Sequence, residues 1–199
     1  MAAHFLNGAA VYMQNFKITG TNFDGLKIID SFYAPDNRGG YQKIFEKNIF
    51  SSCGLPVIFG EFSNIYSKKG ALRGLHYQTK DSQGKLINVL KGKIFDVALD
   101  LRTESSTFGQ WTSFILDGND KKAIYIPEGF AHGFLALEDD TIFSYQCTGQ
   151  YRPECCGGIK WNDKDLNIDW PLETIDEVIL SEKDKNWPSF QEYVNNLKR

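Results

Sequence analysis

The chain has 199 residues, of which 42% are hydrophobic and 24% are charged, and its formal net charge at pH 7 is −3. This length suits one domain with a sizeable core, and the weakly negative charge gives no support for a nucleic-acid-binding protein, which needs a basic face. No apolar run approaches the roughly 20 residues that a membrane span requires. Aromatic residues make up 14% of the chain, a share that favours strands.

The beginning of the chain and the cysteines indicate the extent of the domain and the compartment of the protein. We interpret residues 1–12 as a flexible leader or an extension left by cloning, and residues 13–199 as a single domain. The four cysteines are Cys53, Cys147, Cys155 and Cys156. They form no CxxC pair and no secretory signal precedes them, so we expect reduced thiols and a cytoplasmic protein.

Short runs of strand-forming residues alternate with turns from residue 15 to about residue 148. They predict strands at 26–30, 41–45, 57–67, 72–78, 85–90, 94–102, 111–116, 123–126, 133–137 and 141–148. Many short strands separated by glycine turns predict an all-β sandwich, jelly roll or barrel.

Segment 94–102 has the clearest alternation, because apolar residues occupy every second position and Asp96 and Asp100 lie between them. This pattern predicts a strand that is buried on one face only. The Lys-Gly-Lys triplet at 91–93 predicts a tight hairpin turn before it. Near the end of the chain, apolar residues spaced three, four and seven positions after Phe190 predict one short helix.

Arg73 and His76 lie in an apolar segment, residues 70–78. Burying either charge without a partner is costly. The segment is therefore either a strand whose polar side chains reach solvent, or an anion-binding arginine beside a general base. His132 lies between the small residues Ala131 and Gly133, which allow a ligand to approach, but taken alone this pattern favours a structural histidine.

Two histidines in a jelly roll raise the alternative of a metal-dependent cupin. Such sites usually contain a His-x-His pair, but Tyr77 and Gln78 follow His76. The ligand spacing of a metal site is therefore missing, and we expect no metal and no cofactor.

Several separated cations lie beside glycines or turns and are candidates for gripping phosphate oxygens. They are Arg38, Arg73, Lys85 and Lys183. Taken singly, each is more typical of a solvated surface charge. No P-loop and no Gly-x-Gly-x-x-Gly follows a strand, which excludes those two modes of nucleotide binding.

Two tyrosines and one aspartate complete the candidates. Tyr145 and Tyr151 suit proton donation if they face a reacting carbon, and otherwise suit packing. Asp184 follows Ser181 by three residues, and from this spacing alone we favour a helix N-cap.

Eight segments along residues 14–188 match the motifs of one family in order. They are NRG (37–39), SKKGALRGLHYQ (67–78), QGKL (83–86), DVALDLR (96–102), STFGQW (106–111), IPEGFAHGF (126–134), WND (161–163) and LSEKD (180–184). On these strings the chain resembles the dTDP-4-dehydrorhamnose 3,5-epimerase family. The resemblance implies a cupin-type double-stranded jelly roll that acts as a homodimer without a metal.

The resemblance also implies roles for single residues. His76 matches the general base and Asp184 its carboxylate partner, Tyr145 matches the general acid, and Lys85 matches the cation near the sugar keto oxygen. Residues that match substrate contacts are Arg38, Arg73, His132 and Lys183, with Tyr151 near the site and Lys43 at a substrate-contact position. The chain departs from the common family pattern at Lys43, Ser63, Ile65 and Cys156.

The implied activity is inversion of carbon 3, carbon 5 or both in a nucleotide-linked 4-keto-6-deoxy sugar, in the biosynthesis of deoxysugars and surface glycans. Two alternatives in the same class are inversion of one carbon only and action on a GDP- or CDP-linked sugar. An alternative of a different class is a sugar-binding jelly roll without catalysis.

Overall fold

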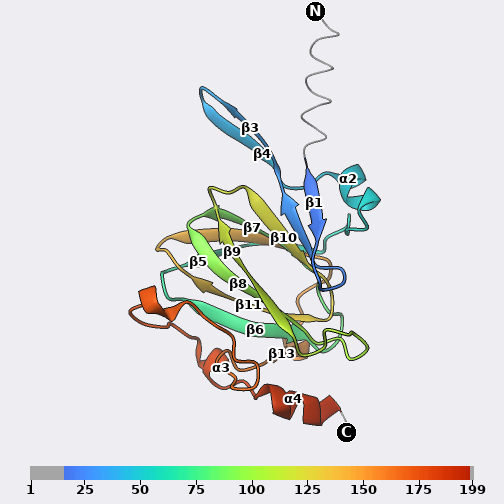
Figure 1. The fold of residues 1–199 in the computed structure, drawn as a ribbon, viewed down its shortest axis with the longest axis vertical. Coiled ribbons are helices and arrows are strands. Elements are labelled where there is room, and N and C mark those ends of the chain that lie inside the picture. The colour runs from blue at the N-terminus through green and yellow to red at the C-terminus, as the bar shows by residue number, and fades with distance from the viewer. Residues whose placement is uncertain (1–15, 198–199) are drawn as a thin grey trace, which may run out of the picture.

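The computed structural model describes residues 16–197, so the leader predicted at residues 1–12 lies outside the described residues. Two antiparallel sheets pack against each other (Figure 1). The first sheet has the strand order β1 (Lys17–Gly20), β2 (Lys27–Asp30), β10 (Lys122–Ile126), β7 (Lys85–Lys91), β12 (Thr141–Cys147) and β5 (Glu61–Ser67). The second has the order β13 (Cys156–Gly158), β6 (Leu72–Gln78), β11 (Phe130–Ala136), β8 (Lys93–Asp100) and β9 (Trp111–Asp117).

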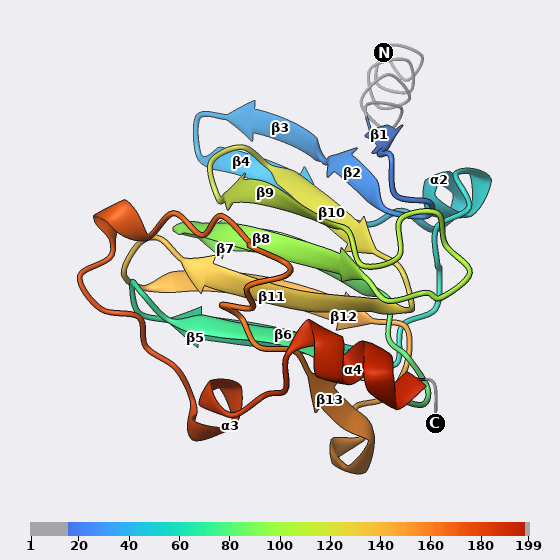
Figure 2. The same ribbon diagram turned by 60° about the horizontal axis from the view of Figure 1, so that its bottom comes forward.

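The remaining elements lie around these two sheets (Figure 2). They are the hairpin of β3 (Phe32–Asp36) and β4 (Gly39–Lys43), the helices α2 (Lys47–Ser52), α3 (Glu182–Lys185) and α4 (Phe190–Leu197), and the 3₁₀ turns η1 (Pro153–Cys155) and η2 (Leu172–Thr174). The predicted all-β jelly roll and the predicted C-terminal helix are confirmed.

Each of the ten predicted strands overlaps an observed strand, with ends that differ by a few residues. The sequence patterns missed β1, β3, β13, α2 and α3, which are all six residues long or shorter. In a short element, capping and tertiary contacts outweigh periodicity. In α2, for example, Glu46 accepts the N–H of Ile49 at 2.9 Å, and Phe50 is fully buried.

The main core lies between the two sheets, where aromatic side chains from both meet. Phe134 of β11 contacts Phe143 of β12 edge to face, with ring centroids 4.6 Å apart. Ile87 of β7 and Ala98 of β8 pack in the same cluster. Because these side chains come from alternate positions of their strands, the positions between them point to the outer faces of the sheets.

Strand β8 is buried on both faces, so the prediction of a half-buried strand was wrong. Val97 and Leu99 point away from the main core and pack in a second cluster, which includes Leu166 and Trp170. The C-terminal part of the chain therefore covers the outer face of the five-stranded sheet. This cover places β8 in the interior, together with its two aspartates.

The hairpin predicted at residues 91–93 was also wrong. Strands β7 and β8 follow each other directly, but they belong to different sheets. The turn at Gly92 therefore carries the chain from one sheet to the other. The pattern correctly identified a turn but could not show which strands pair.

The C-terminal segment is fixed along β6. The N–H of Leu72 donates to the carbonyl of Ile179 at 3.0 Å, and the N–H of Ile179 donates to the carbonyl of Gly70 at 2.9 Å. Helix α3 follows directly and contacts β6. In Figure 2, α3 and α4 lie beside β6 and β13. This attachment places Asp184 of α3 next to a strand more than a hundred residues earlier.

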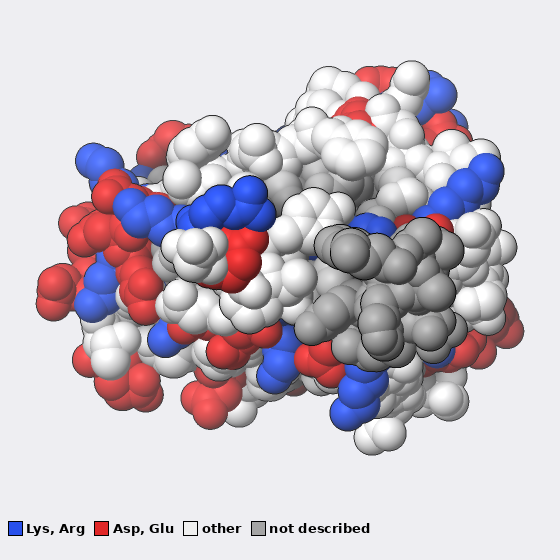
Figure 3. Space-filling view, turned by 90° about the horizontal axis from the view of Figure 1, so that it is seen from above, with Lys and Arg blue, Asp and Glu red and all other residues white. Residues whose placement is uncertain are grey.

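On the face shown in Figure 3, Lys and Arg side chains are interspersed with Asp and Glu over the described part of the chain. All four cysteines are unpaired. None of the helices between residues 16 and 197 is long and apolar enough to cross a membrane.

Asp100 at the end of β8 holds the loop to β9 in place. Its buried carboxylate accepts hydrogen bonds from Nη2 of Arg102, Oγ of Ser105 and Oγ1 of Thr107, each at 2.7 Å. Burial alone would raise the pKa of Asp100, but these donors outweigh it and lower the pKa from 3.8 to about 2. The hydrogen bonds to the charged form therefore stabilise the fold at neutral pH.

We expect Asp100→Ala to lower the free energy of unfolding by about 3 kcal/mol at pH 7, because it leaves a partly buried guanidinium and two hydroxyls without their acceptor. Since the folded pKa lies below the ordinary value, this contribution is lost as the pH falls from about 4 to about 2. Urea unfolding at several pH values measures both the loss of stability at pH 7 and its dependence on pH. Lys91→Ala, which removes an exposed ion pair to Asp140, is the control and is expected to cost less than about 1 kcal/mol. Equal losses in the two variants would contradict this account.

Candidate active site

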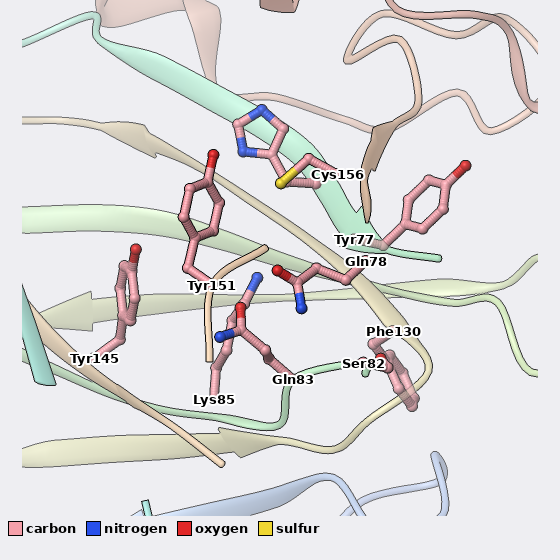
Figure 4. Close-up of a pocket in the computed structure, with 10 residues that line it drawn as sticks. Tyr77, Gln78, Ser82, Gln83, Lys85, Phe130, Tyr145, Tyr151 and Cys156 are labelled. Carbon is pink, nitrogen blue, oxygen red and sulfur yellow. The ribbon is translucent and has the colours of Figure 1, made fainter. Parts of the chain in front are cut away.

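A cavity of about 370 Å³ lies between the two sheets, and polar side chains from both line it. The five-stranded sheet contributes Arg73 and His76 of β6 and His132 of β11. The six-stranded sheet contributes Lys85 of β7 and Tyr145 of β12. Tyr151 lines the cavity as well, so the structure brings together in one cavity six of the site candidates that the sequence singles out. Figure 4 shows an adjoining pocket, and Lys85, Tyr145 and Tyr151 line both that pocket and this cavity.

The strands that carry the two histidines approach each other closely. His76 and His132 are register partners in the β6–β11 pairing. Next to them, Gly74 has a φ of +131°, and a Cβ on it would lie 2.4 Å from Cα of Gly133. Glycine at both positions therefore permits this approach. This explains why a glycine lies next to or near each histidine in the two most specific sequence strings.

His76 pairs with Asp184 through Nε2, which contacts Oδ1 of the carboxylate. Asp184 is almost completely buried, and burial alone would raise its pKa, but hydrogen bonds from His76, Ser181 and Trp187 outweigh burial and lower the pKa. An ionised carboxylate only accepts hydrogen bonds, so Nε2 of His76 carries a proton. In the neutral imidazole, Nδ1 then holds the free lone pair and is the atom that can accept a proton.

Asp184 also takes part in the N-cap arrangement that its spacing from Ser181 predicts. Ser181 is the N-cap of α3, and its Oγ accepts the N–H of Asp184 at 3.1 Å. The same Oγ donates to Oδ2 of Asp184 at 2.7 Å. The cap and the contact with His76 therefore coexist, because they use different atoms of Asp184.

Tyr145 lies on the opposite sheet from His76, across the cavity. Burial raises the pKa of Tyr145 above its ordinary value. The phenol is therefore protonated at neutral pH and has a proton to give. Two titratable groups on opposite walls can act on opposite faces of a molecule bound between them.

Lys85 supplies positive charge inside the cavity. None of the carboxylates in the described part of the chain forms an ion pair with its ammonium. Burial lowers the pKa of Lys85, although the surrounding Cys147, Asp96 and Cys156 favour its charged form. An ammonium with a lowered pKa is a stronger donor to an oxygen on which negative charge develops.

His132 has its own carboxylate partner. Its Nε2 lies 2.8 Å from Oδ2 of Asp96, and both side chains are buried. Burial lowers the pKa of His132, and the Asp96 carboxylate opposes this shift only in part. Asp96 was interpreted from the sequence only as part of a polar strand face. The sequence signal that could have identified this contact is an aspartate inside an otherwise apolar strand, because a buried carboxylate requires a partner.

Lys183 and Tyr151 lie around a side pocket of about 210 Å³ that opens next to the main cavity. Arg73 and His76 line both spaces. The ammonium of Lys183 lies 5.0 Å from the ring centre of Trp187. Tyr151 is fixed by its backbone N–H, which donates to the carboxylate of Glu61. Arg73 and Lys183 are therefore two cations that lie beside the His76–Asp184 pair.

Arg38 and Lys43 lie elsewhere in this chain. Both belong to the β3–β4 hairpin, which projects from the two sheets in Figure 1. The Arg38 side chain is 85% exposed and pairs with Asp36 at 2.6 Å. Neither residue lines the cavity or the side pocket. The structure therefore does not bring these two candidates together with the others within one chain.

Three residues at which the chain departs from the common motif pattern do line these spaces. Ser63 and Ile65 of β5 line the main cavity, and Cys156 of β13 lines the side pocket together with Tyr151 and His76. Figure 4 shows the Cys156 sulfur near the Tyr151 ring. Among residues 16–197, no group of three or more His, Cys, Asp or Glu side chains is arranged to hold a metal ion.

Comparisons with known proteins give consistent results for sequence and structure. A family model described as dTDP-4-dehydrorhamnose 3,5-epimerase matches residues 20–192. The enzyme of that name from Methanothermobacter thermautotrophicus is 47% identical over 180 residues, which cover 90% of this chain and 97% of the relative.

Solved structures of similar proteins share the fold closely. The dTDP-6-deoxy-D-glucose-3,5-epimerase of Legionella pneumophila, in complex with dTDP-4-keto-L-rhamnose, has a TM-score of 0.85 and 42% identity, and the match covers 89% of this chain and 94% of that one. A 3′-monoepimerase from Streptomyces bikiniensis, in complex with dTDP, has a TM-score of 0.83 and 28% identity, and the match covers 90% and 89%.

Proposed function

The chain belongs to the dTDP-4-dehydrorhamnose 3,5-epimerase family and is an isomerase of deoxysugar biosynthesis, and from this premise we propose which residues act and on what. The substrate is a dTDP-linked 4-keto-6-deoxy sugar, and both carbon 3 and carbon 5 are inverted. One observation carries the proposal: His76 of one sheet, paired with Asp184 of α3, lies across the cavity from Tyr145 of the other sheet.

His76 is the general base. The ketone at carbon 4 makes the protons on carbons 3 and 5 acidic, because the resulting negative charge spreads onto the keto oxygen. Nδ1 of His76 takes the proton, since Nε2 already donates to Asp184. The buried carboxylate then stabilises the imidazolium that forms.

Lys85 stabilises the enolate oxygen. Negative charge develops on this oxygen as the proton leaves, and a fixed donor in a largely enclosed site lowers the energy of that state. The lowered pKa of His132 favours Lys85 over His132 as the source of positive charge. His132 is then a substrate contact whose ring Asp96 holds in place.

Tyr145 returns a proton from the other side of the sugar. The raised pKa of its phenol keeps the hydroxyl protonated until the enolate has formed. Because base and acid lie on different sheets, the proton arrives on the face opposite to the one it left, and the carbon is inverted. No other group has to supply or remove electrons in this sequence.

Arg73, Lys183 and Tyr151 hold the rest of the substrate. Arg73 and Lys183 lie beside the His76–Asp184 pair, where their positive charges suit the diphosphate of a nucleotide sugar. Contacts at a distance from the reacting carbons keep the sugar in register between base and acid.

The alternatives are less well supported. The relatives named as 3,5-epimerases are 38–47% identical in several cases, whereas the 3′-monoepimerase is 28% identical. The similar structures described above contain a dTDP-linked sugar or dTDP, which favours dTDP over GDP or CDP. A binding protein without catalysis does not need a base, a carboxylate partner and an opposed acid in one cavity.

Arg38 and Lys43 fit the proposal if the protein is a homodimer. They lie outside the cavity of their own chain, so a substrate contact requires the hairpin to reach the cavity of a second copy. The outer face of the six-stranded sheet is suited to such contact. Phe62 and Tyr66 of β5 point away from the cavity and are 74% and 67% exposed.

We expect His76→Ala to reduce the exchange of substrate protons with solvent deuterium by at least about 10³-fold, because His76 is the group that takes the proton. Proton NMR in deuterium oxide with dTDP-4-keto-6-deoxyglucose measures the exchange. An unchanged far-ultraviolet circular dichroism spectrum and melting temperature would show that the fold survives. Exchange at the wild-type rate would refute the assignment of the base.

We expect Tyr145→Phe to separate exchange from inversion. Proton abstraction comes first, so the initial exchange at carbon 3 or carbon 5 falls by less than about tenfold, while the formation of inverted product falls by about 10²-fold or more. The same NMR experiment records both, because deuterium incorporation and the ring coupling constants are read from one spectrum. Equal losses of the two would count against Tyr145 as the acid.

We expect complementation between two inactive variants if Arg38 acts in the partner's cavity. Co-expression of His76→Ala with Arg38→Ala should restore about a quarter of the wild-type activity, because half of the dimers are mixed and each of these has one intact site. Co-expression of His76→Ala with Lys85→Ala is the control, since both residues belong to the same cavity. No restoration in the first mixture, or restoration in the control, would contradict this assembly.

A further inference from the structure

Trp187 lies between α3 and α4, and no sequence pattern drew attention to it. We propose that Trp187 is a positioning residue, which holds the Asp184 carboxylate and through it orients His76 for proton abstraction. This inference rests on the proposed function, because it assigns a support to the same base.

The indole N–H of Trp187 donates to Oδ1 of Asp184 at 3.1 Å. The same oxygen contacts Nε2 of His76, while Oδ2 accepts from Oγ of Ser181 at 2.7 Å. The carboxylate therefore receives donors on both oxygens. With these positions filled, the carboxylate plane cannot turn without breaking a hydrogen bond to a charged group, which is among the stronger interactions in a protein.

The indole ring is held in place by β13. A Cβ on Gly158 would lie 2.3 Å from the ring, so the ring lies directly on the backbone of this strand. Gly158 is the register partner of His76 in the β13–β6 pairing. The rings of Trp187 and His76 meet edge to face, with centroids 6.0 Å apart. Trp187 therefore connects Asp184 to the same strand pair that carries the base.

Such a support is needed because of where Asp184 lies. It belongs to α3, which has only four residues, and a helix of that length has little stability of its own. The base is instead carried by a strand within a sheet. A catalytic pair split between a rigid strand and a short helical turn requires a fixed connection, because small misplacements of a catalytic group reduce the rate strongly.

The test is a set of exchange and turnover measurements on Trp187→Phe. This variant keeps an aromatic ring beside Lys183 but removes the N–H. We expect kcat and the initial deuterium exchange rate to fall together by about tenfold, with KM unchanged within about twofold, because the support acts on the base and not on substrate binding. Trp111→Phe is the matched control: it removes an indole N–H that donates to the carbonyl of Leu166 at 2.8 Å, away from the cavity, and we expect wild-type kinetics.

A double-mutant cycle separates positioning from general destabilisation. In an Asp184→Asn background, Trp187→Phe should cause no further loss of exchange, because its effect is transmitted through the carboxylate. The same tenfold loss in both backgrounds, a rise in KM alone, or wild-type exchange in Trp187→Phe would each overturn the inference. If Trp187→Phe does not fold, the analogue of tryptophan with sulfur in place of the N–H, incorporated at position 187, provides the same comparison. Absence of exchange in the wild-type protein would instead refute the proposed function.

Discussion

The contact between His76 and Asp184 is the interaction on which the rest of the site depends. It joins a strand of the five-stranded sheet to a short helix 108 residues later in the chain. It is possible only because the segment around Ile179 runs along the start of β6 and delivers α3 to the sheet. A buried carboxylate is costly unless it is hydrogen-bonded, and this one is satisfied by an imidazole, an indole and a hydroxyl. The same three donors keep it ionised, and the ionised carboxylate fixes the tautomer of the base.

Inversion of a carbon also requires a base and an acid on opposite sides of the sugar, and the two-sheet architecture supplies this arrangement. Side chains alternate along each strand, so the inner positions of both sheets point into the same interior. In one part of that interior, the rings of Phe134 and Phe143 contact each other and fill the space between the sheets. Beside them the inner positions are polar, and His76 and Tyr145 lie across a cavity from each other. A fold that holds two titratable groups on facing sheets is suited to removing a proton from one side of a ring and returning one to the other.

The sequence predicted the strands well because their alternation or apolar runs are local signals. It did not predict the pairing at Gly92 or the burial of both faces of β8, since both depend on which distant segments meet. The site residues show the same division. The motif strings identified the residues around the cavity, whereas the partners Asp96 and Trp187 depend on tertiary packing and gave little local signal. Arg38 and Lys43 lie outside the cavity of their own chain, and their predicted role depends on an assembly that no periodicity reveals.

The central claim is that the wild-type protein removes and returns protons next to a ketone. The most direct measurement is proton NMR of dTDP-4-keto-6-deoxyglucose with the wild-type protein in deuterium oxide. The account predicts that deuterium enters at both carbon 3 and carbon 5, followed by a product inverted at both. Exchange at one carbon only would restrict the activity to a single centre. No exchange at either carbon would contradict the account.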